Sequence, residues 1–335
     1  MSNFILPDTY KSPLGVYDTQ VAIGFLKRTF EDKLARALNL IRVSAPLFVD
    51  PKTGLNDDLN GVERAVNIDI KETGAEAHIV HSLAKWKRQA LQSYGFPVGQ
   101  GLYTDMNAIR RDAEMDHLHS LYVDPWDGEQ VISREDRNVD YLKATVKAIV
   151  AAIADTKEAL NAKYPALKTT LCREVAFITT QQLEDLYPEL SPKEREDIFL
   201  AEYKTAFIMQ IGDVLKSGKK HDGRAPDYDD WALNGDILFY DEVLGRAFEV
   251  SSMGIRVDAE SMDSQLKKAG ADERRNYPFH KAVLDGTLPL TMGGGIGQSR
   301  LSMLLLEKAH IGEVQVSLWD DDTLTQARAN GIVIL

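Results

Sequence analysis

The stretch Gly293-Gly294-Gly295-Ile296-Gly297-Gln298-Ser299-Arg300 decides how the rest of the chain is interpreted. Four glycines in five residues allow the backbone to approach a ligand closely and to adopt dihedral angles that other residues avoid. An apolar helical pattern follows at once, so the sequence predicts a glycine loop that leads into a helix, with Arg300 in its first turn. Amides at a helix N-terminus favour anions, and arginine adds a forked donor for phosphate. Tight packing of strand against helix is the alternative explanation for the same glycines.

Two common nucleotide-binding motifs are excluded for this stretch. No Gly-Lys-Ser/Thr ends it, so it is not a Walker loop. Gln298 stands where the third glycine of a dinucleotide fingerprint belongs, and no early βαβ unit precedes it.

The composition is that of an ordinary soluble chain, with 335 residues, 44% of them hydrophobic. Its length suits one large domain or two smaller ones. The net charge of -12 argues against non-specific binding of nucleic acid. A single cysteine, Cys172, excludes a disulfide scaffold and fits a reduced cytoplasm. We find no signal-peptide pattern and no apolar run long enough to span a bilayer, so we expect a cytoplasmic protein.

The spacing of apolar residues predicts helices and strands without regular alternation. Helices are expected near 18–41, 83–91 and 138–163, after Ser191, and twice between residues 252 and 293. Strands are expected up to Pro46 and near 64–70, 76–82, 101–109, 118–124, 206–211 and 313–318, with a hairpin at 235–252. Polar or charged loops are expected at 51–61, 110–114 and 213–231. This pattern favours an α+β domain on a largely antiparallel sheet.

Asp236 and Glu249 lie on the two strands of the predicted hairpin. A two-residue turn would make them diagonal neighbours, a four-residue turn would make them face each other, and a three-residue loop would put them on opposite faces. Two like charges repel unless a positive group lies between them, and Mg²⁺ takes carboxylate oxygens together with substrate phosphates. The alternative is that both acids are solvated on a half-exposed sheet face.

Arginines and histidines supply the remaining candidates for chemistry. Arg110, Arg256 and Arg300 each lie at or just past the end of an element. A polyphosphate needs several such donors, although a single arginine is most often a surface residue. His117 and His119 share a strand face but have no third ligand at zinc-like spacing, so we interpret them as structural or exposed.

In this order, the pieces resemble the catalytic domain of class II aminoacyl-tRNA synthetases, and most closely the ammonia-dependent asparagine synthetase (aspartate–ammonia ligase) family. The resemblance runs from about residue 15 to 318 and rests on the segments 81–88, 101–104, 118–120, 233–236, 251–256 and 293–301 and on Arg224-Ala225-Pro226-Asp227-Tyr228-Asp229-Asp230-Trp231. It implies that residues 1–335 form one class II catalytic domain, an antiparallel sheet flanked by helices. No anticodon-binding domain is expected, because the first long helix begins near residue 18. The helix and strand up to Pro46 look like the class motif that forms a dimer interface, which implies a homodimer.

The family makes L-asparagine from L-aspartate, ammonia and ATP through β-aspartyl-AMP, and it releases AMP and pyrophosphate. The resemblance implies that Arg110 holds the α-phosphate and that Arg300 holds the polyphosphate and covers the adenine. It places Glu249, Arg256, Gly293, Gly294 and Gly295 in the same ATP site, and Mg²⁺ on Asp236 and Glu249. The substrate aspartate would be fixed by Ser82, Lys87, Asp127 and Asp229, with Ser251 and Ser252 on one strand and their facing left open. Asp57 would deprotonate ammonium.

One segment departs from the family pattern. The family usually reads Val-Asp-Gln-Trp-Asp-Trp, whereas this chain reads Val123-Asp124-Pro125-Trp126-Asp127-Gly128. The family glutamine is expected to touch the reacting carboxylate and phosphate, and Pro125 has neither a side-chain donor nor an amide hydrogen. Two alternatives therefore stand beside the synthetase: a paralogue that adenylates an amino acid for another acceptor, and a catalytically weakened binding protein.

Overall fold

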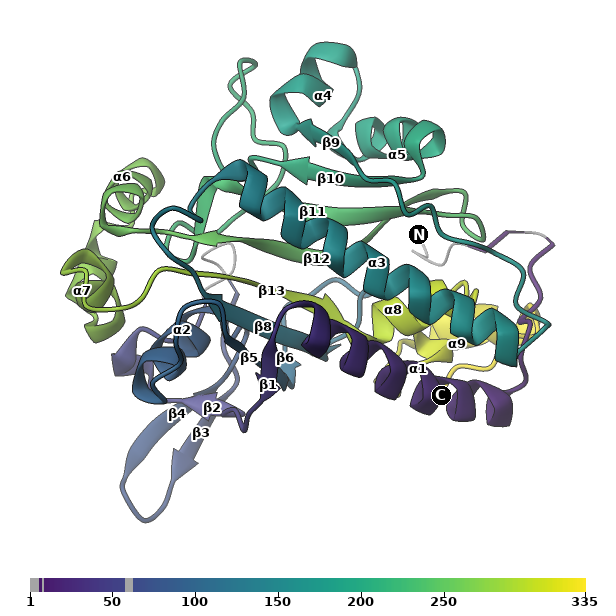
Figure 1. The fold of residues 1–335 in the computed structure, drawn as a ribbon. Coiled ribbons are helices and arrows are strands. Elements are labelled where there is room, and N and C mark those ends of the chain that lie inside the picture. The colour runs from purple at the N-terminus through teal and green to yellow at the C-terminus, as the bar shows by residue number, and fades with distance from the viewer. Residues whose placement is uncertain (1–5, 8, 58–62) are drawn as a thin grey trace.

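An eight-stranded sheet is the centre of the molecule (Figure 1). The computed structural model describes residues 6–7, 9–57 and 63–335. In spatial order the strands are β1 Leu40–Arg42, β5 Gly101–Asp105, β8 Pro125–Val131, β13 Thr291–Gly297, β12 Arg246–Arg256, β11 Asp229–Asp241, β10 Thr205–Met209 and β9 Ala176–Thr179. The central pairings are antiparallel, and parallel pairs occur only at the two edges of this sheet, β1 with β5 and β10 with β9. The predicted α+β class on a largely antiparallel sheet is confirmed.

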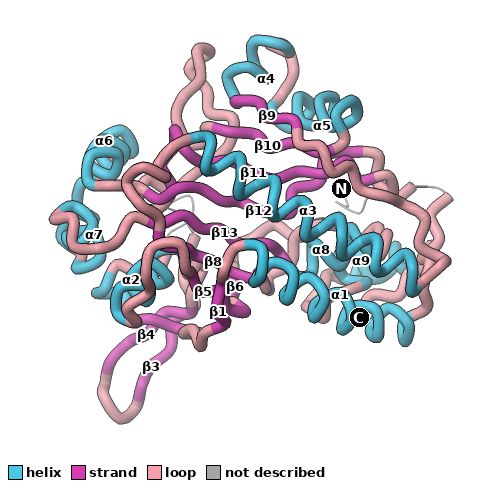
Figure 2. Tube along the Cα trace, viewed as in Figure 1, coloured by secondary structure: helices cyan, strands magenta, loops and turns pink. Residues whose placement is uncertain are grey.

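Two long helices, α1 (Val16–Ala37) and α3 (Val139–Lys163), lie next to each other across one face of this sheet (Figures 1 and 2). Their apolar stripes enter the main core, where the rings of Phe30 and Trp126 lie 4.9 Å apart. Burying such a side chain contributes roughly 1.5–3 kcal/mol. Because side chains alternate along a strand, Trp126 on the helix side places Asp127 on the opposite face. That uncovered face is where the polar residues gather.

Shorter elements surround the sheet. They are the helices α2 Ala84–Ser93, α4 Thr180–Leu186, α5 Pro192–Tyr203, α6 Ala259–Ala269, α7 Pro278–Leu284, α8 Gln298–Leu305 and α9 Asp321–Ala329, and the small sheets β2 Phe48–Val49 with β4 Ala75–Ile79 and β3 Asn67–Ile70, and β6 Ala108–Ile109 with β7 Tyr122–Val123. Ser191 caps α5, as predicted: its side chain accepts from the Glu194 amide, and Pro192 occupies the first turn. Within the described ranges, no helix is both long and apolar enough to cross a membrane.

The glycine stretch is a strand, not a loop, so that prediction was wrong. Gly293 and Gly294 lie in β13, paired with β8 on one side and β12 on the other, and α8 begins at Gln298. A Cβ on Gly293 would lie 2.0 Å from Glu129 Oε2, and one on Gly294 would lie 2.4 Å from Met253 Cβ. These two glycines are therefore required by close packing between strands, the alternative noted from the sequence.

Three further predictions were wrong or incomplete. Residues 313–318 form no strand: a short 3₁₀ turn, Ile311–Glu313, is followed by irregular chain and then by the unexpected helix α9. Strand β8 was missed, because Pro125 and Gly128 read as strand breakers. Proline is tolerated there as the first residue of the strand. The elements β9 and α4 were also not predicted, and the part of the expected 51–61 loop from residue 58 onward lies outside the described residues.

The hairpin β11–β12 has a four-residue loop, 242–245, so the three-residue alternative is excluded. A register shift between Ile237 and Leu238 then pairs Asp236 with Ser252 and Leu238 with Glu249. Direct pairing of Asp236 with Glu249 was therefore wrong, because the loop begins at residue 242 and a bulge moves the register. The two carboxylates nevertheless remain within electrostatic reach, since the charge of Glu249 contributes to a raised pKa of Asp236.

Candidate active site

A cavity of about 510 Å³ opens on the sheet face that α1 and α3 leave uncovered. Most residues that the sequence assigned to a site line it: Asp57, Ser82, Arg110, Asp127, Asp229, Glu249, Ser251, Ser252, Arg256, Gly294, Gly295 and Arg300. Three assigned residues lie outside the lining, namely Lys87, Asp236 and Gly293. Both Ser251 and Ser252 reach the cavity, and Pro125 lies in its wall at the start of β8. The cavity lining therefore brings together segments from residue 57 to residue 315.

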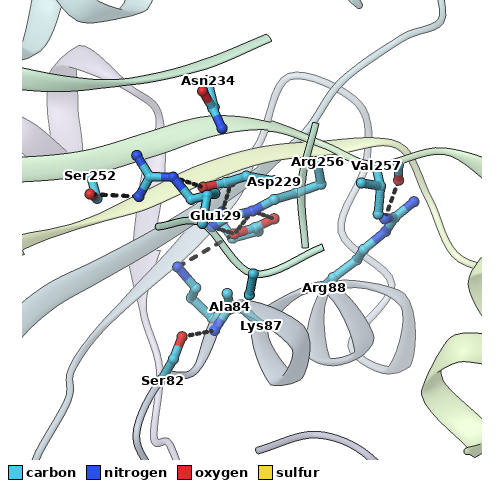
Figure 3. A network of polar contacts seen from close by, with 12 residues as sticks. Ser82, Ala84, Lys87, Arg88, Glu129, Asp229, Asn234, Ser252, Arg256 and Val257 are labelled. Carbon is cyan, nitrogen blue, oxygen red and sulfur yellow. Dashed lines mark hydrogen bonds and ion pairs between the residues drawn. The ribbon is translucent and has the colours of Figure 1, made fainter. Parts of the chain in front are cut away.

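The floor of the cavity is a buried network of alternating charges (Figure 3). Lys87 rises from α2, fully buried, and its Nζ donates to the Gly128 carbonyl at 2.8 Å and contacts Asp127. The same Nζ lies 3.4 Å from Glu129 Oε2. Burial alone would raise the pKa of Glu129, but Arg256 and Lys87 outweigh it and hold that pKa below its usual value.

Arg256, at the end of β12, joins two carboxylates of this network. Its Nε and Nη2 donate to Glu129 at 3.0 and 2.7 Å, and its Nη1 donates to Asp229. Figure 3 shows the guanidinium between these two acids. Asp127 and Asp229 are thus held by cations beneath them while they line the cavity, which suits them to receive a positively charged amino group.

Arg224 also lines the cavity and makes a second set of contacts, to the hairpin strands β11 and β12. Its Nη1 donates to Ser252 Oγ at 2.7 Å, its Nη2 donates to Asp236 Oδ1 at 2.6 Å, and the Ser252 hydroxyl donates to the same oxygen at 2.5 Å. Burial raises the pKa of Asp236 to about 6 against the opposing charge of Arg224, and Glu249 adds to the rise. The structure therefore places a cation beside Asp236.

Arg300 and Arg110 supply positive charge at another part of the lining. Arg300 donates to the Glu249 carbonyl at 3.2 Å and to His119 Nε2 at 2.7 Å. Because arginine can only donate, His119 Nε2 accepts and its Nδ1–H donates to Asp116 at 2.9 Å. Arg110 follows β6 and lines the cavity, and its buried Nε has no hydrogen-bond partner among the described residues. Two arginines at the lining favour an anionic ligand.

Asp57 lines the cavity, and hydrogen bonds of its neighbour Asn56 connect its loop to residues 79–81, at the end of β4 and before α2. Asn56 Oδ1 accepts from the backbone amides of Asp57 and His81 at 3.0 and 2.8 Å, and its Nδ2 donates to the Ile79 carbonyl at 3.2 Å. Ser82 lies beside this junction, where its hydroxyl accepts from the Ala84 amide at 3.1 Å. A carboxylate and a hydroxyl therefore enter the lining from one corner.

A metal would have to be held by carboxylates and by its ligand. Among the described residues, no three His, Cys, Asp or Glu side chains group closely enough to hold a metal ion by themselves. Burial would raise the pKa of Glu249, but Arg300 and Lys193 outweigh it and keep that pKa below its usual value. Glu249 is therefore held in the lining as a carboxylate, the form that binds a cation.

Sequence reasoning gave no role to three residues that the site contains: Glu129, Arg224 and His119. Glu129 was hidden because β8 was not predicted, and His119 was interpreted as structural or exposed. Arg224 stood inside a segment of the family resemblance, and that was the only signal that could have found it.

Comparison with known proteins gives consistent matches. The family model described as "Aspartate-ammonia ligase" matches residues 17–331. An aspartate–ammonia ligase from Ruminiclostridium cellulolyticum is 57% identical over 336 residues, covering 100% of each chain. Another from Bacillus cytotoxicus is 59% identical over 313 residues, covering 93% of this chain and 96% of its own.

Solved structures resemble the fold at much lower identity. Asparaginyl-tRNA synthetase from Pyrococcus horikoshii, complexed with asparaginyl-adenylate, gives a TM-score of 0.66 at 14% identity and covers 90% of this chain and 70% of its own. The Entamoeba histolytica asparaginyl-tRNA synthetase in complex with asparaginyl-adenylate gives a TM-score of 0.62 at 13% sequence identity, and the match covers 90% of this chain and 66% of its own. This chain thus spans about two thirds of that synthetase. The expected class II synthetase fold is confirmed.

Proposed function

The chain belongs to the aspartate–ammonia ligase family, and we propose that the cavity described above is where it joins ammonia to aspartate. The activity is ATP-dependent synthesis of L-asparagine from L-aspartate and ammonia through β-aspartyl-AMP, with release of AMP and pyrophosphate. A carboxylate is a poor acyl donor because its leaving group would be oxide, and adenylation replaces that group with AMP. The observation that supports this location most is the convergence of the sequence-assigned residues on one lining.

Aspartate lies, in this proposal, over the charged floor. Asp127 and Asp229 receive its α-amino group, and the hydroxyls of Ser82 and Ser251 help to orient its carboxylates. Lys87 is a positioning residue, because its three contacts to β8 fix Asp127 from below. Fixed acceptors orient a substrate without reorganisation at the moment of reaction.

ATP lies, in this proposal, between Arg110 and Arg300. In-line transfer needs positive groups around the transferring phosphorus more than it needs covalent chemistry. The pairing of Arg256 with two carboxylates supports an indirect role for it, in which it keeps Asp229 in place. Gly294 and Gly295 line the cavity, and Gly295 leaves room beside the strand for the nucleotide, since a Cβ there would approach no atom closer than Pro125 Cβ at 3.4 Å.

Mg²⁺ fits the donor set, since it takes one or two carboxylates together with substrate phosphates. We place it on Glu249, which lines the cavity, with Asp236 as the second carboxylate once its bond to Arg224 is exchanged. Bound there, Mg²⁺ would neutralise the polyphosphate charge.

Asp57 is the proposed base for the second step. A general base must lie within hydrogen-bond reach of the proton that it removes. Asp57 enters the lining from the corner fixed by Asn56, where a small nucleophile can approach.

The described part of the chain is proposed to work as one catalytic domain, in the cytoplasm and as a homodimer. Exposed apolar side chains lie at the start of α1 (Val16, Tyr17 and Val21) and on the strands that follow its end (Ile41 on β1 and Phe48 on β2). Exposed apolar side chains favour association with a partner where they form a common surface. Light scattering after size exclusion should give twice the mass of one chain, and the mass of one chain would contradict the dimer.

Product identity tests the proposed function. Purified protein with ATP, Mg²⁺, aspartate and ammonium as the sole nitrogen source should form asparagine and AMP in equal amounts. Formation of neither product, with ATP–Mg²⁺ binding intact by calorimetry, would favour the weakened binding protein that Pro125 raised as an alternative. Pyrophosphate exchange that depends on added tRNA would favour the paralogue.

A further inference from the structure

His81 lines the cavity but has no role in the reaction described above. It is almost fully buried between β4 and α2, and its Nε2 has no hydrogen-bond partner among the described residues. Buried polar atoms in native proteins are nearly always hydrogen-bonded, so an exception calls for a ligand or another explanation.

The neighbours of His81 determine which of its nitrogens carries the proton. Its Nδ1 lies 3.0 Å from the backbone carbonyl of Asp57. A carbonyl can only accept, so Nδ1 carries the hydrogen, and in the neutral ring Nε2 is then a lone-pair acceptor. Asn56 fixes this arrangement, because its Oδ1 accepts from the amides of both Asp57 and His81.

Two acceptors therefore belong to residues that line the cavity and contact each other: Nε2 of the His81 ring, and the carboxylate of Asp57, whose backbone carbonyl lies against that ring. A ligand for such a pair must offer several N–H donors, and a positive charge suits the carboxylate. Ammonium meets both requirements. It must also lose two protons before it becomes an amide nitrogen, and this corner supplies two groups that accept protons.

We propose that Asp57 and His81 Nε2 together form the ammonium subsite, an assignment that rests on the proposed function. Ammonium donates one N–H to Nε2 and gives one proton to Asp57, which leaves neutral ammonia. The nitrogen lone pair forms a bond to the acyl carbon of β-aspartyl-AMP. The adduct passes its second proton to Nε2, and the C–O bond to AMP breaks with the electron pair leaving on AMP.

Two substitutions of His81 separate its nitrogens. His81→Asn keeps a donor near the position of Nδ1 and removes the acceptor, whereas His81→Gln places an amide oxygen near the position of Nε2. His78→Asn is the matched control, because His78 is a neighbour on β4 that pairs with Glu76 away from the cavity lining. Thermal unfolding of each variant checks that the fold is kept.

Three rates are measured: aspartate-dependent ATP–pyrophosphate exchange, which needs no nitrogen donor; asparagine formation against ammonium concentration; and hydroxamate formation with hydroxylamine, which is mostly uncharged at neutral pH. His81→Asn should keep exchange within about twofold and raise the KM for ammonium on the order of tenfold or more. Hydroxamate formation should fall less than amide formation, because neutral hydroxylamine needs only the second of the two proton transfers. His81→Gln should recover part of that loss, and the control should change nothing.

An unchanged KM for ammonium in His81→Asn would overturn the subsite. An equal fall in exchange and in amide formation would also overturn it, because it would reveal a purely structural role. A failure of the proposed function itself is distinguishable, since the unmodified protein would then form no asparagine from ammonium.

Discussion

At the scale of single residues, partners decide role more than residue type does. Arg110, Arg256 and Arg300 looked alike in the sequence as candidate phosphate ligands. In the structure Arg256 is enclosed by Glu129 and Asp229, whereas Arg110 has a buried Nε without a partner among the described residues. No local pattern distinguishes these cases, because the partners come from distant strands.

Arg256→Leu should destabilise the protein by about 3–5 kcal/mol, because it leaves the buried carboxylates of Glu129 and Asp229 without their shared cation. Arg173→Ala is the control: its ion pairs are largely exposed and should be worth about 0–1 kcal/mol. Urea unfolding measures both values, and equal effects would contradict the structural role of Arg256.

Arg110→Ala should slow adenylation on the order of 10²–10³-fold, the loss typical of a donor that stabilises developing charge. Its neighbour Arg111 is exposed and outside the lining, so Arg111→Ala should keep the rate. Pyrophosphate exchange reports the step directly. An Arg110 variant within a few-fold of the unmodified protein would remove this residue from the phosphate site.

Pro125→Gln should raise the turnover number of asparagine formation. The residue lines the cavity at the first position of β8, and glutamine would add the side-chain donor that the family pattern has there. The backbone needs no rearrangement, because the Pro125 carbonyl already accepts from the Met106 amide at 3.0 Å and glutamine would keep that bond. A turnover number equal to or below that of the unmodified protein would show that the proline is not the limiting feature.

At the scale of elements, the sequence predicted the long helices and four interior strands, β5, β10, β11 and β12, but not the two strands between them, β8 and β13. The helix at 138–163 was expected within a residue of α3 because its apolar stripe is a local signal, and the structure adds an Asn138 cap at its start. The sequence does not predict strand β8 and predicts a loop in place of β13, because Gly128, Gly293 and Pro125 have low strand preference. Only the neighbouring strands explain these residues, as the close approach of Glu129 to Gly293 shows.

Asp241, the last residue of β11 before the hairpin turn, makes a pH-dependent contribution to the free energy of unfolding. Burial raises the pKa of Asp241 to about 6, although its side chain accepts from the Val243 and Leu244 amides. The folded state therefore holds this proton more tightly than the unfolded chain does. Stability contributed by this group falls as pH rises from about 4 to about 6 and stays lost above that, by roughly 2–3 kcal/mol.

Asp241→Asn should flatten this dependence. At pH 7.5 the variant should be more stable than the unmodified protein by about 1 kcal/mol, since one new buried N–H offsets part of the gain. At pH 4.5 the advantage should vanish. Urea unfolding at the two pH values gives the difference, and an equal effect at both would contradict the raised pKa.

At the scale of the whole molecule, the two faces of the main sheet have different roles: one is packed into the core, and the other carries the cavity. Helices α1 and α3 bury one face in the main core, and the other face collects charged residues from strands and loops far apart in the sequence. The family resemblance predicted which residues would meet, Lys87 and Arg256 among them, but not the contacts that hold them. Those contacts, in which Glu129 and Arg224 take part, became visible only with the strand order.

The fate of the oxygen atoms of the aspartate side chain tests the central claim most directly. Aspartate labelled with ¹⁸O at both oxygens of its side-chain carboxylate is converted in the presence of ATP, Mg²⁺ and ammonium. The masses of the products are then measured by mass spectrometry. Attack of that carboxylate on the α-phosphorus predicts one labelled oxygen in AMP, one in the amide of asparagine and none in pyrophosphate. Asparagine formed with unlabelled AMP would contradict the adenylate route and, with it, the role given to this cavity.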